Sequence, residues 1–193
     1  MNSGQLIVDS GQLPQGWNIK TLSEVCKINP PKSEARKKLT ENDFVSFLPM
    51  SNLGVKQKTI MPVETRRFGE VVKGYTYFAN NDVLLAKITP CFENGKLGIA
   101  RNLINAIGFG SSEYIVFRSK DIIEPEYIFY FLSQDSLRKV GARFLCGTAG
   151  QKRVSKDFIK NYPITLPPLE EQKQIVEILD EAFEGIDKAI ENT

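Results

Sequence analysis

Residues 169–193, LEEQKQIVEILDEAFEGIDKAIENT, form the most regular stretch of the 193-residue chain. Val176, Leu179, Phe183, Ile186 and Ile190 follow one another at alternating intervals of three and four residues. That spacing is the seam of a coiled coil of about two heptads, and it predicts a helix that pairs with another helix. The alternative is an amphipathic helix that packs back on its own domain.

The net charge changes sign where this helix begins. Residues 169–193 hold eight acidic side chains and two lysines, a net charge of −6, whereas residues 1–168 have a net charge of +8. A basic body followed by an acidic helix predicts two surfaces with different partners. Taken alone, the basic body is weak evidence for nucleic-acid binding, because many soluble domains carry a similar charge.

The composition narrows the class of protein. With 41% hydrophobic and 25% charged residues, the chain has the make-up of a soluble globular protein. It contains neither an apolar run of about 18 residues nor a signal peptide, so we expect no membrane span and a cytoplasmic location. The three cysteines are far apart, which fits a reducing compartment. Because the chain has no histidine, Ser-His-Asp catalysis and histidine-ligated metal sites are excluded.

The middle of the chain indicates a β-rich body. Between residues 44 and 119, the short apolar runs FVSFLPM, RFGEVV, YTYF, NDVLLAKITP and EYIVFRS are separated by Gly, Asn and Pro. They predict short strands joined by tight turns, and Asn94-Gly95 is a hairpin-type turn signal. In the last run Ile115 and Phe117 alternate with Val116, as expected of a strand.

Short helices and loops complete the body. Thr21 and Glu24 have the spacing of a capping box, and Ser155 is placed to cap a short helix over residues 156–161. Residues 124–144 predict one helix, and the polar residues 29–43 predict a loop. The predicted fold is therefore α+β. A β-rich domain with a few short helices occupies residues 1–168, of which 1–12 are expected to be flexible, and a coiled-coil-like helix occupies residues 169–193.

Two groups of residues are weighed as catalytic motifs and disfavoured. NPPK at residues 29–32 resembles the Asn-Pro-Pro-aromatic motif of N6-adenine methyltransferases, but Lys32 stands where the aromatic residue is needed, and the glycine-rich cofactor loop is missing. Asp82, Glu93 and Lys96 lack the spacing of metal-dependent nucleases, which favours an ordinary charged hairpin.

The stretch CGTAGQKRV, residues 146–154, has the composition of a phosphate-binding loop. It matches neither nucleotide-binding glycine motif, so a nucleotide cofactor is not expected. Gly147 and Gly150 permit close approach or a positive φ. Gln151, Lys152 and Arg153 offer donors for the phosphates or bases of a nucleic acid. The alternative is an exposed loop without a ligand.

Three stretches together resemble one family. LPQGWNIKTLSEV, GYTYFANNDVLLAKITPCFENGK and GTAGQKRVSKDFIKNYPITLPPLEEQKQIVEIL occur in the order seen in specificity subunits of type I restriction–modification systems. The resemblance runs from about residue 13 to the end of the chain. It implies a target recognition domain over residues 1–168, followed by a conserved-region helix that acts as spacer and dimer element.

The resemblance also implies a role without catalysis. Such subunits read double-stranded DNA and bind methyltransferase subunits, and through them the endonuclease and translocase subunits. S-adenosylmethionine, ATP and magnesium are then expected on those partners and no cofactor on this chain. A full-length member has two recognition domains, so this chain is expected to be a half-sized subunit that forms a homodimer, or a fragment. The alternatives are a stand-alone methyltransferase or nuclease, and an adaptor that binds methyltransferase subunits without reading DNA.

These considerations define the candidate site residues. No residue is assigned to catalysis or to a metal. The candidate dimer residues are the five seam positions named first. The candidate DNA-binding residues are Arg66, Arg67, Lys87, Thr89, Asn94, Lys96, Thr148, Gln151, Lys152 and Arg153.

Overall fold

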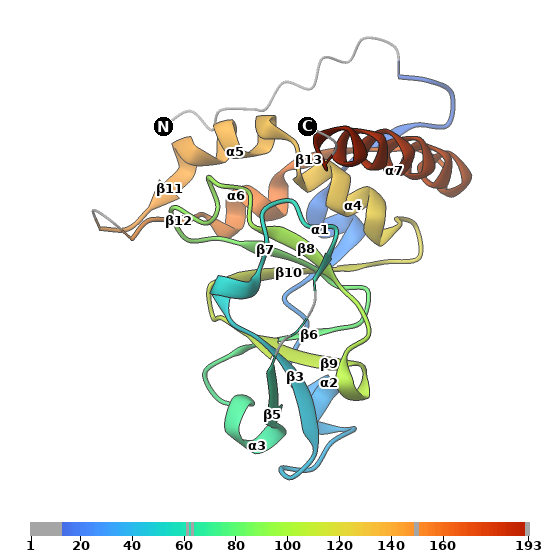
Figure 1. The fold of residues 1–193 in the computed structure, drawn as a ribbon. Coiled ribbons are helices and arrows are strands. Elements are labelled where there is room, and N and C mark those ends of the chain that lie inside the picture. Colours follow the sequence, from blue (N-terminus) through green and yellow to red (C-terminus); the bar gives the residue numbers. More distant parts are fainter. Residues whose placement is uncertain (1–12, 61, 63, 149–150, 192–193) are drawn as a thin grey trace.

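The computed structural model describes residues 13–60, 62, 64–148 and 151–191, so the expected flexible segment 1–12 lies outside the described residues. Two sheets follow one another along the body, and most of the helices gather at the end beyond the larger sheet (Figure 1). The mixed, sheet-rich architecture confirms the predicted α+β class.

The larger sheet has five strands and is buried on both faces. Residues of β10 alternate between two cores: Ile115 and Phe117 pack toward the helices, while Tyr114 and Val116 pack toward the smaller sheet. This confirms the alternation predicted from the sequence. The strands, in spatial order, are β2 (Cys26–Ile28), β10 (Tyr114–Ser119), β7 (Val83–Ala86), β8 (Leu97–Ala100) and β4 (Thr59–Ile60).

The smaller sheet has four strands. Its parallel pair, β3 and β9, lies between two antiparallel neighbours. Phe47, Tyr77 and Phe109 pack on its far face against two short helices, α2 (Ser33–Arg36) and α3 (Phe68–Val71). The strands, in spatial order, are β5 (Glu64–Arg67), β3 (Phe44–Leu48), β9 (Ile107–Gly110) and β6 (Thr76–Ala79).

The helical end of the body carries the remaining elements. Both predicted caps are confirmed: the Thr21 amide donates to Glu24 Oε2 at 2.7 Å, and the Phe158 amide donates to Ser155 Oγ at 3.4 Å. Among the described residues, no helix combines the length and apolar character needed to cross a bilayer. The elements are β1 (Asn18–Thr21), α1 (Leu22–Val25), α4 (Pro125–Leu132), α5 (Asp135–Gly141), β11 (Leu145–Cys146), β12 (Arg153–Val154), α6 (Lys156–Asn161), β13 (Pro163–Leu166) and α7 (Leu169–Glu191).

Two predictions about helices are wrong. The single helix expected over residues 124–144 is broken between α4 and α5, because Gln134 is extended and the Ser133 hydroxyl donates to the Tyr130 carbonyl instead of continuing the helix. Polar Ser and Asp side chains favour such local bonds over helix propagation. The loop expected over residues 29–43 contains α2, whose Ala35 is fully buried against the smaller sheet.

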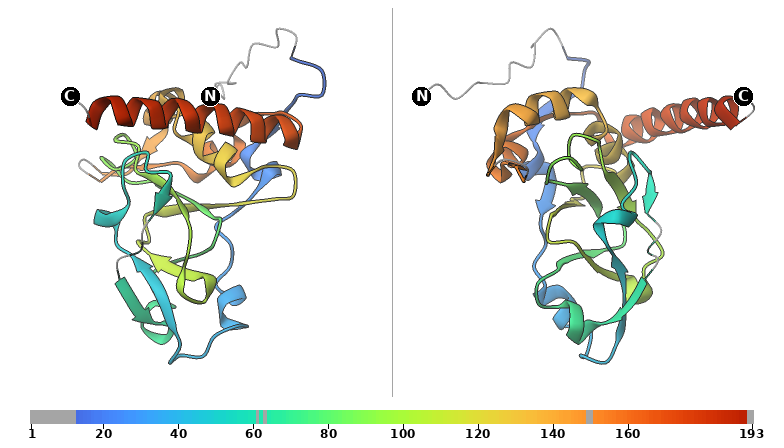
Figure 2. Two further views of the ribbon diagram at one scale, coloured as in Figure 1. Left: turned by 45° about the vertical axis from the view of Figure 1, so that its right-hand side comes forward. Right: turned by 60° about the vertical axis from the view of Figure 1, so that its left-hand side comes forward.

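α7 divides into a docked half and a projecting half (Figure 2). Gln172 is fully buried and bonds three backbone groups of the body, and Val176 belongs to the main core. Farther along, Ile186 and Ile190 are 52% and 67% exposed. The docked half therefore agrees with the alternative of a helix that packs on its own domain. The projecting half agrees with the alternative of a helix that pairs with another helix. Val176 was predicted to face a partner, and that prediction is wrong because its own core covers it.

A buried ion pair joins the two sheets. Arg118 on β10 donates to both carboxylate oxygens of Asp82, at 2.8 and 2.7 Å, and the Asp82 side chain is only 1% exposed. Asp82 also accepts the Ala79 amide from β6 at 2.7 Å. A third bond from Arg118, donated by Nη1, reaches Glu34 on α2. Asp82 thus has a structural role, and it is fixed between the sheets.

Replacing Arg118 with Met is expected to lower the free energy of unfolding by about 3–5 kcal/mol, because it leaves the buried Asp82 carboxylate without its cation. Urea denaturation followed by circular dichroism measures this. Arg36→Met, at an exposed position on α2, is the matched control and should change the value by less than about 0.5 kcal/mol. Equal stability of the two variants would contradict the assigned role.

Candidate nucleic-acid interface

A groove on the surface of the body gathers three lysines from separate parts of the chain. Lys32 precedes α2, Lys87 follows β7, and Lys156 begins α6. We call this 280 Å³ cavity the basic groove. Tyr75 and Ser112 also line it. Of the described residues that line the groove, none is acidic, so it presents cations and hydrogen-bonding groups together.

The electrostatics of the groove favour an anion. Burial lowers the pKa of Lys32, and neighbouring Arg36 lowers it further. Burial also lowers the pKa of Lys87, and repulsion from Lys156 and Arg153 adds to the effect while Glu113 partly offsets it. Cations that repel one another in a partly desolvated groove are stabilised when an anion enters. Phosphate groups of a nucleic-acid backbone carry that charge.

The hairpin made by β11 and β12 lies beside the groove and is fastened to the segment after β7. The Thr89 amide donates to the Lys152 carbonyl at 2.9 Å, and the Lys152 amide donates to Thr89 Oγ1 at 3.1 Å. Gly147 has a φ of 129°, as expected for a glycine in this turn, whereas Gly150 lies outside the described residues. Four predicted residues, Lys87, Thr89, Lys152 and Arg153, are therefore brought together.

Arg153 is committed to the protein itself. Its Nε and Nη2 atoms donate to the two Glu113 carboxylate oxygens at 2.9 and 2.7 Å. Its Nη1 donates to the Gln151 carbonyl at 3.1 Å, so three of its five N–H groups bind the protein. Arg153 therefore anchors the hairpin, and its contact with DNA stays a prediction. Lys152, by contrast, is exposed, as are Thr148 and Gln151 near the hairpin tip.

Lys96 and Asn94 lie apart from the groove. Lys96 Nζ donates to the carbonyls of Met50 and Ser51, at 2.9 and 3.4 Å, so it stabilises a loop. Lys87 Nζ in the groove likewise donates to the Ser112 carbonyl at 2.8 Å. The assignment of Lys96 to DNA stays a prediction. Asn94 is exposed beside Gly95, whose φ of 75° matches the predicted turn.

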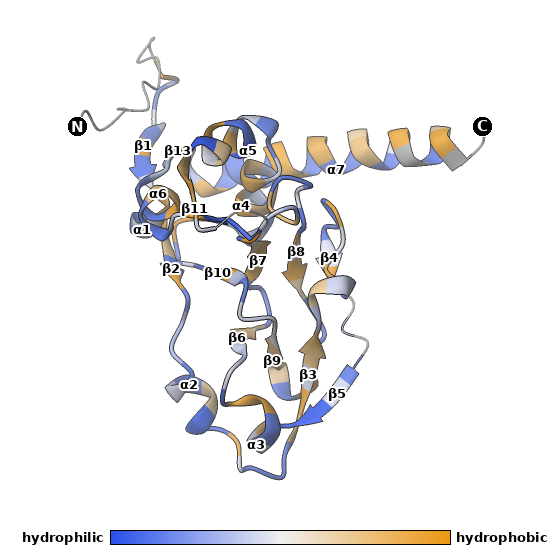
Figure 3. Cartoon of the chain, turned by 90° about the vertical axis from the view of Figure 1, so that its left-hand side faces the viewer, coloured by the Kyte–Doolittle hydropathy of each residue, from blue (hydrophilic) through white to orange (hydrophobic). Residues whose placement is uncertain are grey.

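The two arginines of β5 differ in their surroundings. Arg66 lies over the Phe47 ring at 4.6 Å, and that ring meets Tyr75 of the groove edge-on at 4.9 Å. Its Nε and Nη2 atoms donate to Glu64 Oε2 at 3.2 and 2.7 Å, so its charge is paired within β5. Arg67 lies over Phe44 at 5.2 Å, on the other face of the strand. Figure 3 shows β5 as a hydrophilic strand at the edge of the body.

Nothing in the sequence indicates that Lys32, Lys156 and Tyr75 share a surface. They are far apart in the chain, and no spacing rule connects them. The only signal is NPPK itself: a polar turn with a lysine at the end of an apolar stretch. Asn29 adopts a φ of 51° there, and its side chain accepts the Val116 amide at 2.9 Å, which holds this turn against β10.

The fold and its surface define a class: a sheet-rich domain with a basic groove, joined to a helix that projects from it. The chain belongs to the family of the type I restriction modification DNA specificity domain, which matches residues 14–193. It is 40% identical to the EcoAI specificity subunit of Escherichia coli over 166 residues, 86% of this chain and 28% of that protein. It is 41% identical to the EcoEI specificity subunit from the same species, over 86% of this chain and 27% of that protein.

Solved structures share the fold. The HsdS subunit from Thermoanaerobacter tengcongensis superimposes with a TM-score of 0.73 at 20% identity, covering 93% of this chain and 45% of that one. A chain from work on complex assembly and conformational transition of the type I R-M system gives 0.67 at 22% identity, covering 95% and 42%. The chain thus spans about a quarter of these curated relatives and less than half of these solved chains.

Removing cations from the groove is expected to weaken DNA binding on every sequence. Lys32→Ala and Lys156→Ala should each lower the slope of log affinity against log salt concentration by about 1, because each lysine neutralises about one phosphate. Fluorescence anisotropy of labelled duplexes at several salt concentrations measures this. Lys173→Ala on α7 removes the same charge outside the groove and serves as control. Equal losses in all three variants would refute the groove as the interface.

Proposed function

We propose that this chain is the DNA-recognition subunit of a type I restriction–modification complex and reads one half of a split target. The observation that carries the proposal is the family match over nearly the whole described chain. The basic groove supports it, because three lysines on a β-rich body can position a duplex through its phosphates. Sequence choice then requires side chains that reach base edges beside this anchor.

The proposal includes a second recognition domain beside this one. The solved relatives are more than twice as long as the part this chain matches. Two copies joined through the projecting halves of α7 would supply two recognition domains. Ile186 and Ile190 continue the seam beyond the docked half of the helix and leave apolar surface uncovered. In this proposal Leu179 and Phe183 have a double role, since both also line grooves against the body.

The chemistry of the complex belongs to other subunits in this proposal. The methyltransferase subunits bind S-adenosylmethionine, and the endonuclease subunits bind ATP and magnesium. This chain contributes DNA recognition and directs those subunits to the target. An adaptor that binds methyltransferase subunits without reading DNA, and a stand-alone methyltransferase or nuclease, are the alternatives that experiment must separate.

Co-expression with the cognate methyltransferase subunit, followed by mapping of methylated adenines in the genome, tests the proposal. We expect methylation at one split, inverted-repeat sequence with a fixed spacer. The chain expressed alone should leave the DNA unmodified. Methylation by the chain alone would show a stand-alone enzyme, and methylation that does not change when this chain is omitted would show that it does not select the target.

The dimer is tested by charges placed in the seam. Ile186→Asp combined with Ile190→Asp should convert the dimer into a folded monomer, because buried carboxylates oppose helix pairing. Light scattering gives the mass, and circular dichroism reports the fold. Gly185→Asp adds a charge to an open position outside the seam and should leave the mass unchanged. A dimer mass retained by the double variant would remove α7 as the interface.

A further inference from the structure

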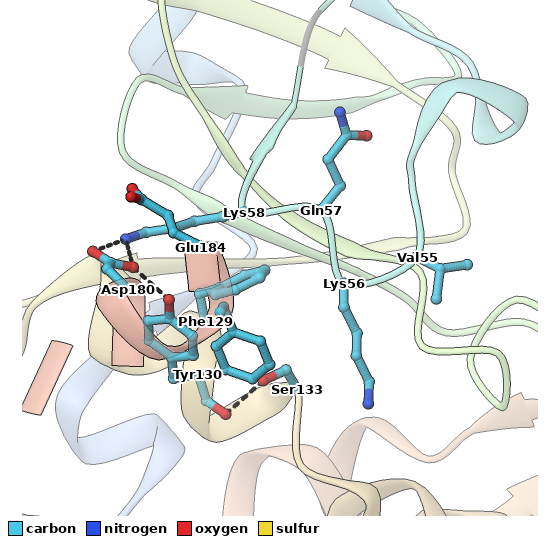
Figure 4. A pocket seen from close by; sticks show the side chains of 10 residues that line it. Val55, Lys56, Gln57, Lys58, Phe129, Tyr130, Ser133, Asp180 and Glu184 are labelled. Atoms are coloured by element: carbon cyan, nitrogen blue, oxygen red, sulfur yellow. Dashed lines mark hydrogen bonds and ion pairs between the residues drawn. The ribbon is translucent and has the colours of Figure 1, made fainter. Parts of the chain in front are cut away.

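The point at which α7 leaves the body is held by one small cluster of polar contacts. Lys58, just before β4, donates to both carboxylate oxygens of Asp180 on α7. The Tyr130 hydroxyl on α4 donates to the same carboxylate. Figure 4 shows these three side chains converging from α7, from α4 and from the segment before β4. Each of Lys58 and Asp180 is about one-third exposed, so the pair lies at the edge of the core.

Aromatic contacts accompany the ion pair. One turn beyond Asp180, Phe183 stacks on Tyr130 with ring centroids 5.8 Å apart and an interplanar angle of 13°. Lys58 Nζ also lies 5.4 Å from the centre of the Tyr130 ring. Burial and the nearby Asp180 carboxylate raise the pKa of Tyr130, so its hydroxyl stays protonated and donates. Tyr130 therefore contacts two side chains of α7, the Asp180 carboxylate and the Phe183 ring.

Open space borders this cluster. A cavity of about 560 Å³ is lined by Lys58, Asp180 and Glu184, and a neighbouring one of about 520 Å³ is lined by Phe131 and Leu179. The two cavities share Lys56, Tyr130, Ser133 and Phe183. Protein interiors normally hold a helix by close packing along its length. The first half of α7 is held in this way by Val176 and the buried Gln172. At Asp180 a few directional contacts take that role, so the direction of the projecting half depends on them.

A small change of helix direction has a large consequence farther out. The part of α7 beyond Asp180 is about 16 Å long, so a rotation of about 10° at that residue moves its end by about 3 Å. Successive nucleotides of one DNA strand are separated by about 3.4 Å along the duplex axis. A second recognition domain carried beyond the helix end would shift by at least this amount, which corresponds to about one base pair.

We propose that Lys58, Tyr130 and Asp180 form a latch that fixes the direction of α7 and thereby sets the spacer length between the two DNA half-sites. The first part concerns the isolated chain, and the second rests on the proposed function. The latch residues position the helix and do not touch DNA. Spacer choice then depends on the junction as well as on helix length, because the angle and the length together set the separation of the domains.

Distance measurement by double electron–electron resonance tests the first part without DNA. Nitroxides are placed at Lys37→Cys on the body and Gly185→Cys on α7, in a chain whose accessible cysteines are replaced by Cys91→Ser and Cys146→Ser. Dilution with unlabelled chain removes distances between copies. Lys58→Met and Asp180→Asn should shift or broaden the distance distribution by about 3 Å or more.

Two further variants keep this test decisive. Lys56→Met removes a neighbouring lysine that pairs with Asp135 instead of Asp180, and should leave the distribution unchanged. Lys58→Glu with Asp180→Lys exchanges the charges and should give a narrower distribution than either single change. Unchanged distances in Lys58→Met and Asp180→Asn would overturn the latch, as would a charge exchange that restores nothing.

The second part is tested in the complex with methyltransferase subunits, on duplexes whose spacer differs by single base pairs. The parent and Lys56→Met should favour one spacer. The latch variants should lose roughly an order of magnitude of that discrimination, or favour a neighbouring spacer, because bending of the DNA no longer has to absorb the mismatch. If the latch variants change the distance distribution but keep the spacer preference of the parent, the proposed link between helix direction and spacer length is wrong. Absence of any target in the parent would refute the proposed function and leave the distance result standing.

Discussion

Arg118 and Asp82 meet between the two sheets, where the Asp82 side chain is almost completely removed from solvent. The pair lies beside the hydrophobic core between the sheets, where Leu48 and Phe78 of the smaller sheet pack with Val116 of the larger one. Through Glu34 the same guanidinium also holds α2, and its face lies 5.5 Å from the centre of the Tyr77 ring on β6. One side chain therefore connects the larger sheet, the smaller sheet and the helix beneath it. A buried charge of this kind tolerates few arrangements, because each must satisfy all its partners.

The basic groove lies directly over this network. Tyr77 lines the groove and touches Arg118, while Lys32 stands two residues before Glu34. The lysines on opposite walls thus keep a fixed separation, although they come from elements that belong to different cores. Preorganisation of this sort lowers the cost of binding a charged backbone, since the cations are already gathered. The hairpin of β11 and β12, which Arg153 anchors to Glu113, extends the same surface toward the helical end of the body.

α7 connects the body that carries the basic groove to any partner that binds the projecting half of the helix. Its first half is part of the fold, held by Gln172 and Val176, and its second half is a lever with apolar residues in contact with solvent. Figure 3 shows hydrophobic and hydrophilic residues alternating along that projecting half. A helix with this division transmits the orientation of the body to a partner, because it cannot pivot freely where it is docked. The latch at Asp180 lies where the docked half of α7 ends and the projecting half begins.

Local sequence determined the parts of this protein that depend on neighbours in the chain. The strand pattern of β10, the caps of α1 and α6, the turn at Gly95 and the length of α7 all follow from periodicity and from side chains a few residues apart. Motif order likewise indicated the family. Only the tertiary structure decided which charges are free. Arg153 and Lys96 bond to the protein itself, while Lys32 and Lys156 line a groove that no spacing predicts. The physical reason is that an ion pair or a hydrogen bond depends on distance in space, and residues 40 or 80 positions apart are brought together only when the cores pack.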